Sequence, residues 1–243
     1  MFIEFSTIYF CLKLSLYYFC IMFGLKLIRK YIINPKKSIM IILGSGGHTG
    51  EILLMIKKLD FNKFSDCFFV SSHNDKNSEN KTKESIDINN FKNTKFHFIK
   101  IYRARNVGQS FISSKPTTIY SLIQSLFVLI KTRPNMVVSN GPGVAFPIII
   151  IGYILKILMI LYEFKIMFIE SYCRSKSISL CGKLVEPICD RFIVLWKNLE
   201  SNKREYLGKI LWTTKSRLDF QIKYKNLLLR NYIKYFMIIN LYI

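Results

Sequence analysis

Apolar residues change their spacing repeatedly along the chain, and these changes predict alternating strands and helices. The run from Ile39 to Leu43 is short and continuously apolar, which is typical of a buried strand. Beyond the glycine-rich stretch Gly44 to Gly50, apolar side chains recur at helical spacing from Ile52 to Leu59. This part of the sequence therefore predicts a strand, a tight loop and a helix.

The same alternation continues towards the C-terminus. Short apolar runs predict further strands at Cys67 to Ser71, Phe96 to Ile101, Met136 to Ser139, Ile166 to Ile169 and Phe192 to Trp196. Helical patterns predict further helices at Thr117 to Lys131, Val144 to Tyr162, Ser177 to Cys189 and Leu199 to Tyr206. Strands that alternate with helices are typical of an α/β fold, in which helices cover both faces of a doubly wound parallel sheet.

Two segments depart from this alternation. Residues His73 to Lys95 are rich in polar side chains, which predicts a mobile insertion with a short helix near Glu84. Residues Phe5 to Ile28 are almost wholly apolar and long enough to cross a bilayer as one helix. A cleavable signal peptide is the alternative, but a basic start and a small-residue cleavage site are both absent.

Basic residues follow this apolar segment at once, whereas only Glu4 precedes it. They are Lys26, Arg29, Lys30, Lys36 and Lys37. The positive-inside rule then places the C-terminal side in the cytosol. We therefore expect a transmembrane anchor at residues 1–34, a globular domain at residues 38–210 and an extension at residues 211–243.

Composition narrows the class of protein further. The chain is 51% hydrophobic, and its formal net charge of +21 suits an anionic surface such as a membrane leaflet. An AT-rich coding sequence, which favours Lys, Asn, Ile, Phe and Tyr, would give the same excess. The six cysteines are scattered without a CxxC pair, which fits a reducing compartment and predicts no zinc site. A nucleic-acid-binding protein is disfavoured, because the span is present and no aromatic and basic RNA-binding motif occurs.

Loops with chemically active residues follow the predicted strands, at Gly44 to Gly50, Arg103 to Ser110, Asn140 to Gly143 and Glu170 to Arg174. Parallel strands bring such loops to one edge of the sheet. The glycine loop starts a helix and predicts an anion site. A Walker A loop is excluded, since no Gly-Lys-Ser/Thr closes the loop. A dinucleotide-binding site fits poorly, because Thr49 stands at the third glycine position. Such a site also needs an acidic residue at the end of the second strand, and Asp75 is the only loose candidate.

His48 stands at the tip of this loop. It is able to hydrogen-bond a phosphate or to act as a general base, while the alternative is that it only caps the helix. Glu51 is expected in the first helical turn, where it offsets the helix dipole.

Six motifs occur in one order along the chain: GSGGHTGEILLM, RARNVGQS, NGPG before an apolar helix, IESYCRSKSISLCGKL, DRFIVLW and YLGKI. Together they resemble the membrane-anchored subunit of the two-subunit UDP-N-acetylglucosamine transferase of dolichol-linked oligosaccharide synthesis (the asparagine-linked glycosylation protein 14 family). The resemblance covers Ser38 to about Ile210.

This resemblance implies a Rossmann-like half of a GT-B glycosyltransferase, similar to the acceptor-binding half of the bacterial enzyme that builds the peptidoglycan disaccharide lipid. It implies a soluble UDP-GlcNAc-binding subunit as partner and a dolichol-linked lipid as acceptor. The reaction would add the second GlcNAc to GlcNAc-diphospho-dolichol on the cytosolic face of the endoplasmic reticulum membrane. No cofactor is implied, and no metal either, because no carboxylate pair lies near the site. The alternative is a non-catalytic membrane recruiter or scaffold for the glycosyltransferase partner.

Roles for individual residues follow from the resemblance. Acceptor diphosphate binding is expected from Gly44, Ser45, Gly46, Gly47, Thr49, Arg103, Arg105 and Arg174. His48 is the expected base that activates the sugar hydroxyl, and Glu170 is its rival unless it caps the next helix or pairs with Arg174. The pocket floor is expected from Asn140, Gly141, Pro142 and Gly143.

Further along the chain, some features stay open or differ from the family pattern. The apolar helix Val144 to Tyr162 touches the bilayer or lies in the core. Gly50 replaces a threonine that is usual in the family. Leu211 to Ile243 continue where the family's chain stops, either as a basic amphipathic segment at the membrane or as translated unspliced sequence.

Overall fold

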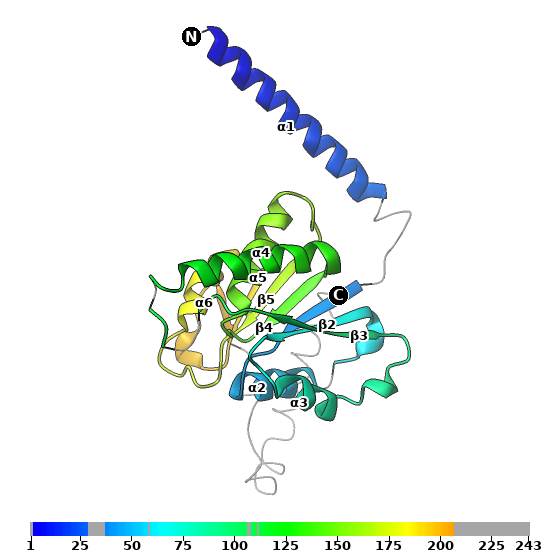
Figure 1. Ribbon diagram of the computed structural model, residues 1–243, viewed down its shortest axis with the longest axis vertical. Helices are drawn as coiled ribbons and strands as arrows, with labels where there is room; N and C mark the ends of the chain where they lie inside the picture. The colour runs from blue at the N-terminus through cyan, green and yellow to red at the C-terminus, as the bar shows by residue number, and fades with distance from the viewer. Residues whose placement is uncertain (1, 29–36, 58, 106–107, 111, 207–243) are drawn as a thin grey trace, which may run out of the picture.

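The structure, a computed structural model, describes residues 2–28, 37–57, 59–105, 108–110 and 112–206. Its centre is a seven-stranded sheet in the order β3-β2-β1-β4-β5-β6-β7, in which all neighbouring strands are parallel (Figure 1). The strands are β1 (Lys37–Ile42), β2 (Phe64–Ser72), β3 (Lys95–Ile101), β4 (Met136–Ser139), β5 (Lys165–Ile169), β6 (Arg191–Val194) and β7 (Arg204–Tyr206).

Helices cover both faces of this sheet. Figure 1 shows α4 and α5 on one side and α2 and α3 on the other. The helices are α1 (Phe2–Ile28), α2 (Gly47–Ile56), α3 (Ser78–Ser85), α4 (Lys115–Thr132), α5 (Ala145–Ile157) and α6 (Leu180–Val185). The expected doubly wound α/β fold is therefore confirmed.

Strand β1 lies in the middle of the sheet because its apolar residues are buried on both faces. Ile39 and Ile41 belong to the core cluster that includes residues of α2, whereas Met40 and Ile42 belong to the cluster that includes residues of α5. A strand covered on both sides reads as a continuous apolar run, which is the pattern of Ile39 to Leu43.

Helix α1 stands apart from these layers. Its window Thr7–Gly24 has a mean hydropathy of 1.4, and none of it is buried inside the described structure. The helix is long and apolar enough to cross a membrane, although a signal sequence has the same length and composition. Its Tyr18 hydroxyl donates a hydrogen bond to the Leu158 carbonyl just after α5. The basic residues Arg29, Lys30 and Lys36 lie outside the described residues.

Two of the expected helices end differently in the structure. Helix α5 ends at Ile157 and not at Tyr162, because Met159 has a φ of 61° and the chain turns there to bury Leu161. In the segment Ser177 to Cys189, α6 stops at Val185 and a 3-10 turn over Glu186–Ile188 follows, where a proline stands.

The expected helix at Leu199 to Tyr206 was wrong. A 3-10 turn covers Lys197–Leu199, and Arg204–Tyr206 form strand β7. Hydrogen bonds to β6 and two ion pairs hold this short strand: the Arg204 guanidinium contacts Glu186 at 2.7 Å, and Arg191 contacts Glu205 at 2.9 Å. Pairing at the sheet edge therefore outweighs local helix propensity.

The short helix expected near Glu84 in the polar segment His73 to Lys95 is confirmed as α3, but the expectation of a mobile insertion was wrong, because the segment packs into the domain. It contains α3 and a 3-10 turn over Ile88–Asn90, and Ser78 and Thr82 are buried. Its polar side chains make hydrogen bonds inside the domain, as described below. The proposed extension at residues 211–243 lies outside the described residues.

Gly152 in α5 provides a test of the packing between this helix and the sheet. A Cβ at this position would overlap the ring of Phe164, which is only 1% exposed. We expect Gly152→Ala to lower the free energy of unfolding by about 1–3 kcal/mol, which is the usual cost of overpacking a core. Thermal unfolding in detergent measures the change. Gly50→Ala is the matched control, because a Cβ there meets nothing within 4 Å, and an equal loss in both variants would contradict the packing described here.

Candidate functional site

The glycine loop connects β1 to α2 and leaves backbone N–H groups free. Gly46 directly precedes the first residue of α2. Its φ of 65° is a backbone angle that residues other than glycine rarely adopt. The first helical bond runs from the Gly50 N–H to the Gly46 carbonyl at 3.4 Å. The N–H groups of Gly47, His48 and Thr49 therefore have no acceptor within the helix and carry the positive end of its dipole.

Gly44 brings the glycine loop against the loop after β4. A Cβ on Gly44 would lie 2.5 Å from the His48 Cβ and 2.8 Å from the Pro142 Cβ. Only glycine permits this approach, so the tip of the first loop and the Asn140 to Gly143 turn are in direct contact. The expected convergence of loops at one edge of the sheet is thus confirmed for these two.

Asn140 and Glu51 fasten three strand ends together. The Asn140 Nδ2 donates to the His48 carbonyl at 2.8 Å and to the Glu51 Oε2 at 3.2 Å. The Ser171 hydroxyl after β5 donates to the Glu51 Oε1 at 3.1 Å. Since α2 begins at Gly47, Glu51 lies beyond the first turn, and its expected role of offsetting the dipole there is replaced by this bridging role.

A buried polar network supports the glycine loop from α3. The Ser78 hydroxyl lies 2.5 Å from the Asp75 Oδ2, 2.9 Å from the Gly44 carbonyl and 2.6 Å from the Thr49 hydroxyl. Thr49 also donates to the Gly44 carbonyl. Asp75 accepts hydrogen bonds from the N–H groups of Asn77 and Ser78 and so holds the start of α3. Asp75, Ser78 and Thr49 are each at most 6% exposed, which makes the hydrogen bonds of their side chains costly to lose.

His48 is half-buried at the tip of the loop. Its Nδ1 and the Oδ1 of Asn140 are both buried and form no hydrogen bond with another described residue. Such unsatisfied atoms are rare in protein interiors and call for an explanation, such as a catalytic role or an absent ligand. Both atoms belong to residues that the sequence places in the site.

Glu170 occupies a different environment. It is 1% exposed, and its carboxylate accepts hydrogen bonds from the N–H of Ser171 at 3.1 Å and from the N–H and hydroxyl of Ser179 at 2.8 and 3.2 Å. Ser179 in turn caps α6 through the Gly182 N–H. The carboxylate therefore stabilises the turn before α6 and has no exposed lone pair to offer a substrate, which favours His48 over Glu170 as a base.

The three expected arginines lie at unequal distances from the loop. The Arg103 Nη2 donates to the Ser45 hydroxyl at 2.7 Å, so its charge stands beside the glycine loop. The Arg105 Nε donates to the Gln109 carbonyl at 2.6 Å. The backbone of Arg105 lies against the Asn140 to Gly143 turn, since a Cβ added to Gly143 would be 3.5 Å from the Arg105 carbonyl oxygen. Arg174 is exposed and is not brought to the loop by any hydrogen bond or ion pair seen among the described residues.

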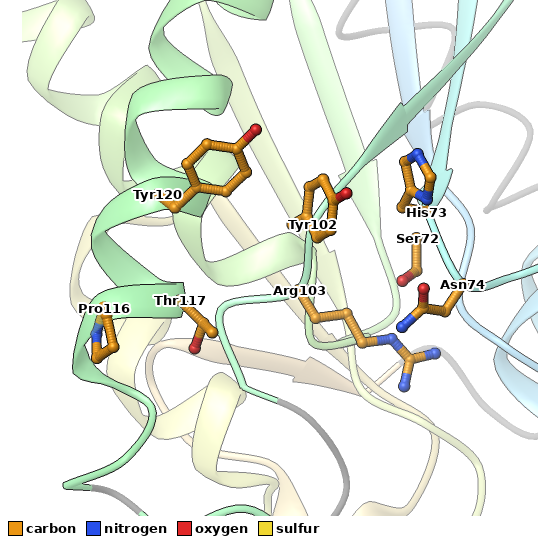
Figure 2. A pocket seen from close by; sticks show the side chains of 8 residues that line it. All are labelled: Ser72, His73, Asn74, Tyr102, Arg103, Pro116, Thr117 and Tyr120. Atoms are coloured by element: carbon orange, nitrogen blue, oxygen red, sulfur yellow. The ribbon is translucent and has the colours of Figure 1, made fainter.

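A cavity of about 420 Å³ adjoins Arg103 between the ends of β2 and β3 and the first turns of α4. Figure 2 shows Tyr102 between Tyr120 and His73, with Arg103 and Asn74 on the same side of the pocket. The rings of His73 and Tyr102 stack at 4.8 Å, and Tyr120 meets Tyr102 edge-on at 5.2 Å. A charged group at one end and aromatic rings at the other suit an amphiphilic ligand.

Metal or thiol chemistry finds no support in the described part of the chain. Groups of three or more His, Cys, Asp or Glu side chains able to hold a metal are absent from it. Burial raises the pKa of the Cys67 thiol well above its usual value and that of Cys181 to about 12. Thiols in such surroundings are poor nucleophiles, so these two cysteines act as small apolar residues.

Some of the residues that support the site were detectable from local sequence patterns. Asp75 in the polar run before Ser78 is typical of a turn in which an aspartate accepts from the N–H groups two and three residues later, and this pattern would have indicated the start of α3. By contrast, the bridging role of Glu51 and the pairing of Tyr102 with Tyr120 depend on contacts between distant segments. No local pattern signals such contacts.

Comparison with known proteins identifies the family. The family model described as oligosaccharide biosynthesis protein Alg14 like matches residues 39–210. Proteins named UDP-N-acetylglucosamine transferase subunit ALG14 are similar to the chain. The one from Candida albicans is 43% identical over 173 residues, covering 70% of this chain and 77% of that protein. The one from Mus musculus is 35% identical over 189 residues, covering 74% and 86%.

A solved structure supports the same fold. The crystal structure of Acinetobacter baumannii MurG matches with a TM-score of 0.51 at 13% identity, covering 70% of this chain and 45% of that one. The likeness shows a shared architecture, that of one half of a GT-B glycosyltransferase. Sequence motifs, family model and relatives agree, and the chain therefore belongs to the Alg14 family of oligosaccharide biosynthesis proteins.

Proposed function

We propose that this chain is the membrane-anchoring and acceptor-binding subunit of a UDP-GlcNAc transferase. It adds the second GlcNAc to GlcNAc-diphospho-dolichol on the cytosolic face of the endoplasmic reticulum, together with a soluble UDP-GlcNAc-binding subunit. The observation that carries the proposal is the glycine loop, whose three free N–H groups adjoin Arg103 in a member of the Alg14 family.

The loop suits the diphosphate of the acceptor. Free N–H groups at a helix N-terminus bind phosphate oxygens, and the helix dipole favours negative charge there. Arg103 adds a charge-assisted bond from the side of Ser45. Arg105 and Arg174 supply further positive charge at a greater distance from the diphosphate. The turn Asn140 to Gly143 forms the floor of the pocket under the loop.

His48 serves as the general base in this proposal. It accepts the proton of the attacking sugar hydroxyl while the new C–O bond forms at the anomeric carbon and UDP leaves with the electrons of the broken bond. Its half-buried position at the loop tip is compatible with this role, whereas Glu170 is committed to Ser171 and Ser179. General bases of this kind contribute about 10²- to 10⁴-fold to rate.

In this proposal a partner supplies a second domain, because the described residues form one Rossmann-like domain. The match to MurG covers 45% of that longer chain, which corresponds to one of its halves. Ligands of doubly wound domains bind at the carboxyl edge of the sheet, so a second domain with the nucleotide sugar would close over the loops described above. Helix α1 anchors the assembly, with the globular domain in the cytosol.

A non-catalytic recruiter is the second candidate, and one observation favours it. A histidine base is normally oriented by a hydrogen bond to its other ring nitrogen, but the Nδ1 of His48 forms none with a described residue. In that case the loop only binds the acceptor, and the partner supplies the base.

Reconstitution tests the proposed reaction directly. We expect the chain co-expressed with the soluble UDP-GlcNAc-binding subunit to transfer GlcNAc from UDP-GlcNAc to a lipid-linked GlcNAc diphosphate, and each subunit alone to transfer none. Radiolabelled sugar in the lipid fraction measures transfer. A pair that assembles and binds both substrates without forming product would refute the proposal.

His48 and Glu170 distinguish catalysis from recruitment. We expect His48→Ala to lower kcat by about 10²- to 10⁴-fold with the acceptor KM much less affected, because a base acts on the transition state. Glu170→Gln keeps an acceptor for Ser179 and should retain most of the activity. The amount of partner recovered with each variant is the control for assembly, and unchanged kcat in fully assembled His48→Ala would identify the recruiter.

Asp75 tests the support of the glycine loop. Asp75→Ala removes the acceptor for Ser78 and the N–H groups at the start of α3, and we expect it to lower the free energy of unfolding by about 1–3 kcal/mol. It should also raise the KM for the lipid acceptor, with the KM for UDP-GlcNAc unchanged. Asp87→Ala is the matched control, since Asp87 is exposed and its carboxylate accepts a hydrogen bond from the Asn90 side chain alone among the described residues. Equal effects on the two KM values would contradict this role.

A further inference from the structure

Helix α4 buries two serines against the domain besides the apolar Leu129. Ser121 and Ser125, both 0% exposed, face the domain, and their hydroxyls donate to the Tyr102 and Ser121 carbonyls. Large apolar side chains point outwards instead: Ile119 is 58% exposed and Phe127 is 69% exposed. A helix at an aqueous surface shows the opposite arrangement, so the outer face of α4 is suited to an apolar environment.

The outward residues form one continuous line along the helix. Pro116, Tyr120, Ile123, Phe127 and Ile130 follow one another at steps of three or four positions. They extend over about 20 Å at a rise of 1.5 Å per residue. Pro116 and Tyr120 also line the cavity beside Arg103 (Figure 2), so this line, called the α4 stripe below, leads directly away from the proposed diphosphate site.

Charge around the α4 stripe is of one sign. Lys115 stands at the start of the helix, and Lys131 and Arg133 stand at its end, all exposed. No acidic residue occurs between Asp87 and Glu163, a stretch that contains both α4 and α5. Basic side chains beside an apolar helix face are typical of binding to an anionic lipid surface.

The membrane-spanning candidate α1 approaches the same side of the domain. Tyr18 bonds the Leu158 carbonyl after α5, next to Ile154 and Ile157, which are also exposed. Figure 1 shows α1 leaving the domain on the side where α4 and α5 lie. The surface that carries the α4 stripe is thus continuous with the chain's own path into the bilayer.

We infer that α4 is a second membrane contact, which lies in the headgroup region with the α4 stripe against the acyl chains. Lys115, Lys131 and Arg133 contact anionic headgroups at its ends. The cavity beside Arg103 then opens at the bilayer surface, so that a diphosphate lipid reaches the glycine loop without leaving the membrane. This last step rests on the proposed function, whereas the membrane contact does not.

Quenching by brominated lipid tests the contact in the full-length chain. Phe127→Trp is reconstituted in vesicles of brominated phosphatidylcholine with a minor fraction of phosphatidylserine, and Leu54→Trp is the matched control. Leu54 is 49% exposed on α2, on the opposite face of the sheet. Both substitutions replace an exposed apolar residue by tryptophan, so neither disturbs the core.

We expect the added fluorescence of Phe127→Trp to fall by roughly twofold or more, because an interfacial helix buries its apolar face below the headgroups. The added fluorescence of Leu54→Trp should stay as in unbrominated vesicles. Equal quenching of the two, or none at Phe127→Trp, overturns the inference. A blue shift of Phe127→Trp on adding the soluble subunit in detergent, with no quenching in vesicles, overturns it in favour of a protein partner on the stripe.

Acceptor chain length tests the delivery step separately. Phe127→Glu should raise the KM for a long-chain polyprenyl acceptor at least several-fold and leave the KM for a short-chain soluble acceptor unchanged. An equal rise for both acceptors refutes the delivery step. If the wild-type pair transfers nothing, the proposed function fails while the quenching result still decides the membrane contact.

Discussion

Parallel hydrogen bonding between the strands is the constraint on which the site depends. Each of the seven strands runs in the same direction, so every loop that leaves a carboxyl end reaches one edge of the sheet. Gly44, Asn140 and Ser171 are distant in sequence, yet they come together there because β1, β4 and β5 are neighbours. Hydrogen bonds through Asn140 and Glu51 then fix loops whose approximate positions the sheet has already determined.

The carboxylates at this edge of the sheet accept hydrogen bonds from neighbouring residues of the domain. Glu51 accepts from Asn140 and Ser171, Asp75 from the start of α3, and Glu170 from Ser171 and Ser179. Carboxylates that accept hydrogen bonds in this way hold the loops in place. The groups that remain available at the loop are N–H donors, a histidine and Arg103, which together suit a phosphate.

Much of this fold was predictable from residue patterns, because buried parallel strands leave continuous apolar runs and glycine loops leave a clear signal. The strands from β1 to β6 and helix α4 were predicted close to their observed positions. Strand β7 was not, since only Arg204–Tyr206 form it and its stability comes from pairing with β6. The mobile insertion predicted for segment His73 to Lys95 was wrong because four of its buried residues, Asp75, Ser78, Thr82 and Thr94, are polar, and hydrophobic periodicity detects only an apolar residue such as Ile86.

The candidate site was predictable in its residues but less so in its roles. His48, Arg103 and Asn140 do meet at the strand ends, because each follows a strand of the same sheet. The hydrogen bonds between Glu170 and Ser179, nine residues later, depend on where α6 begins, and a sequence pattern does not fix that geometry. The apolar outer face of α4 was equally hidden, since periodicity shows that a helix has two faces without showing which one is inside.

Strand β7 has a consequence for how a second protein is able to dock. An open sheet edge invites another strand to pair with it, and short, charged edge strands prevent this. Within the described residues, the sheet ends at β7, whose three residues include Arg204 and Glu205, both held in ion pairs. Sheet extension is therefore blocked at this edge, and a subunit that docks here has to recognise side chains instead of continuing the backbone ladder.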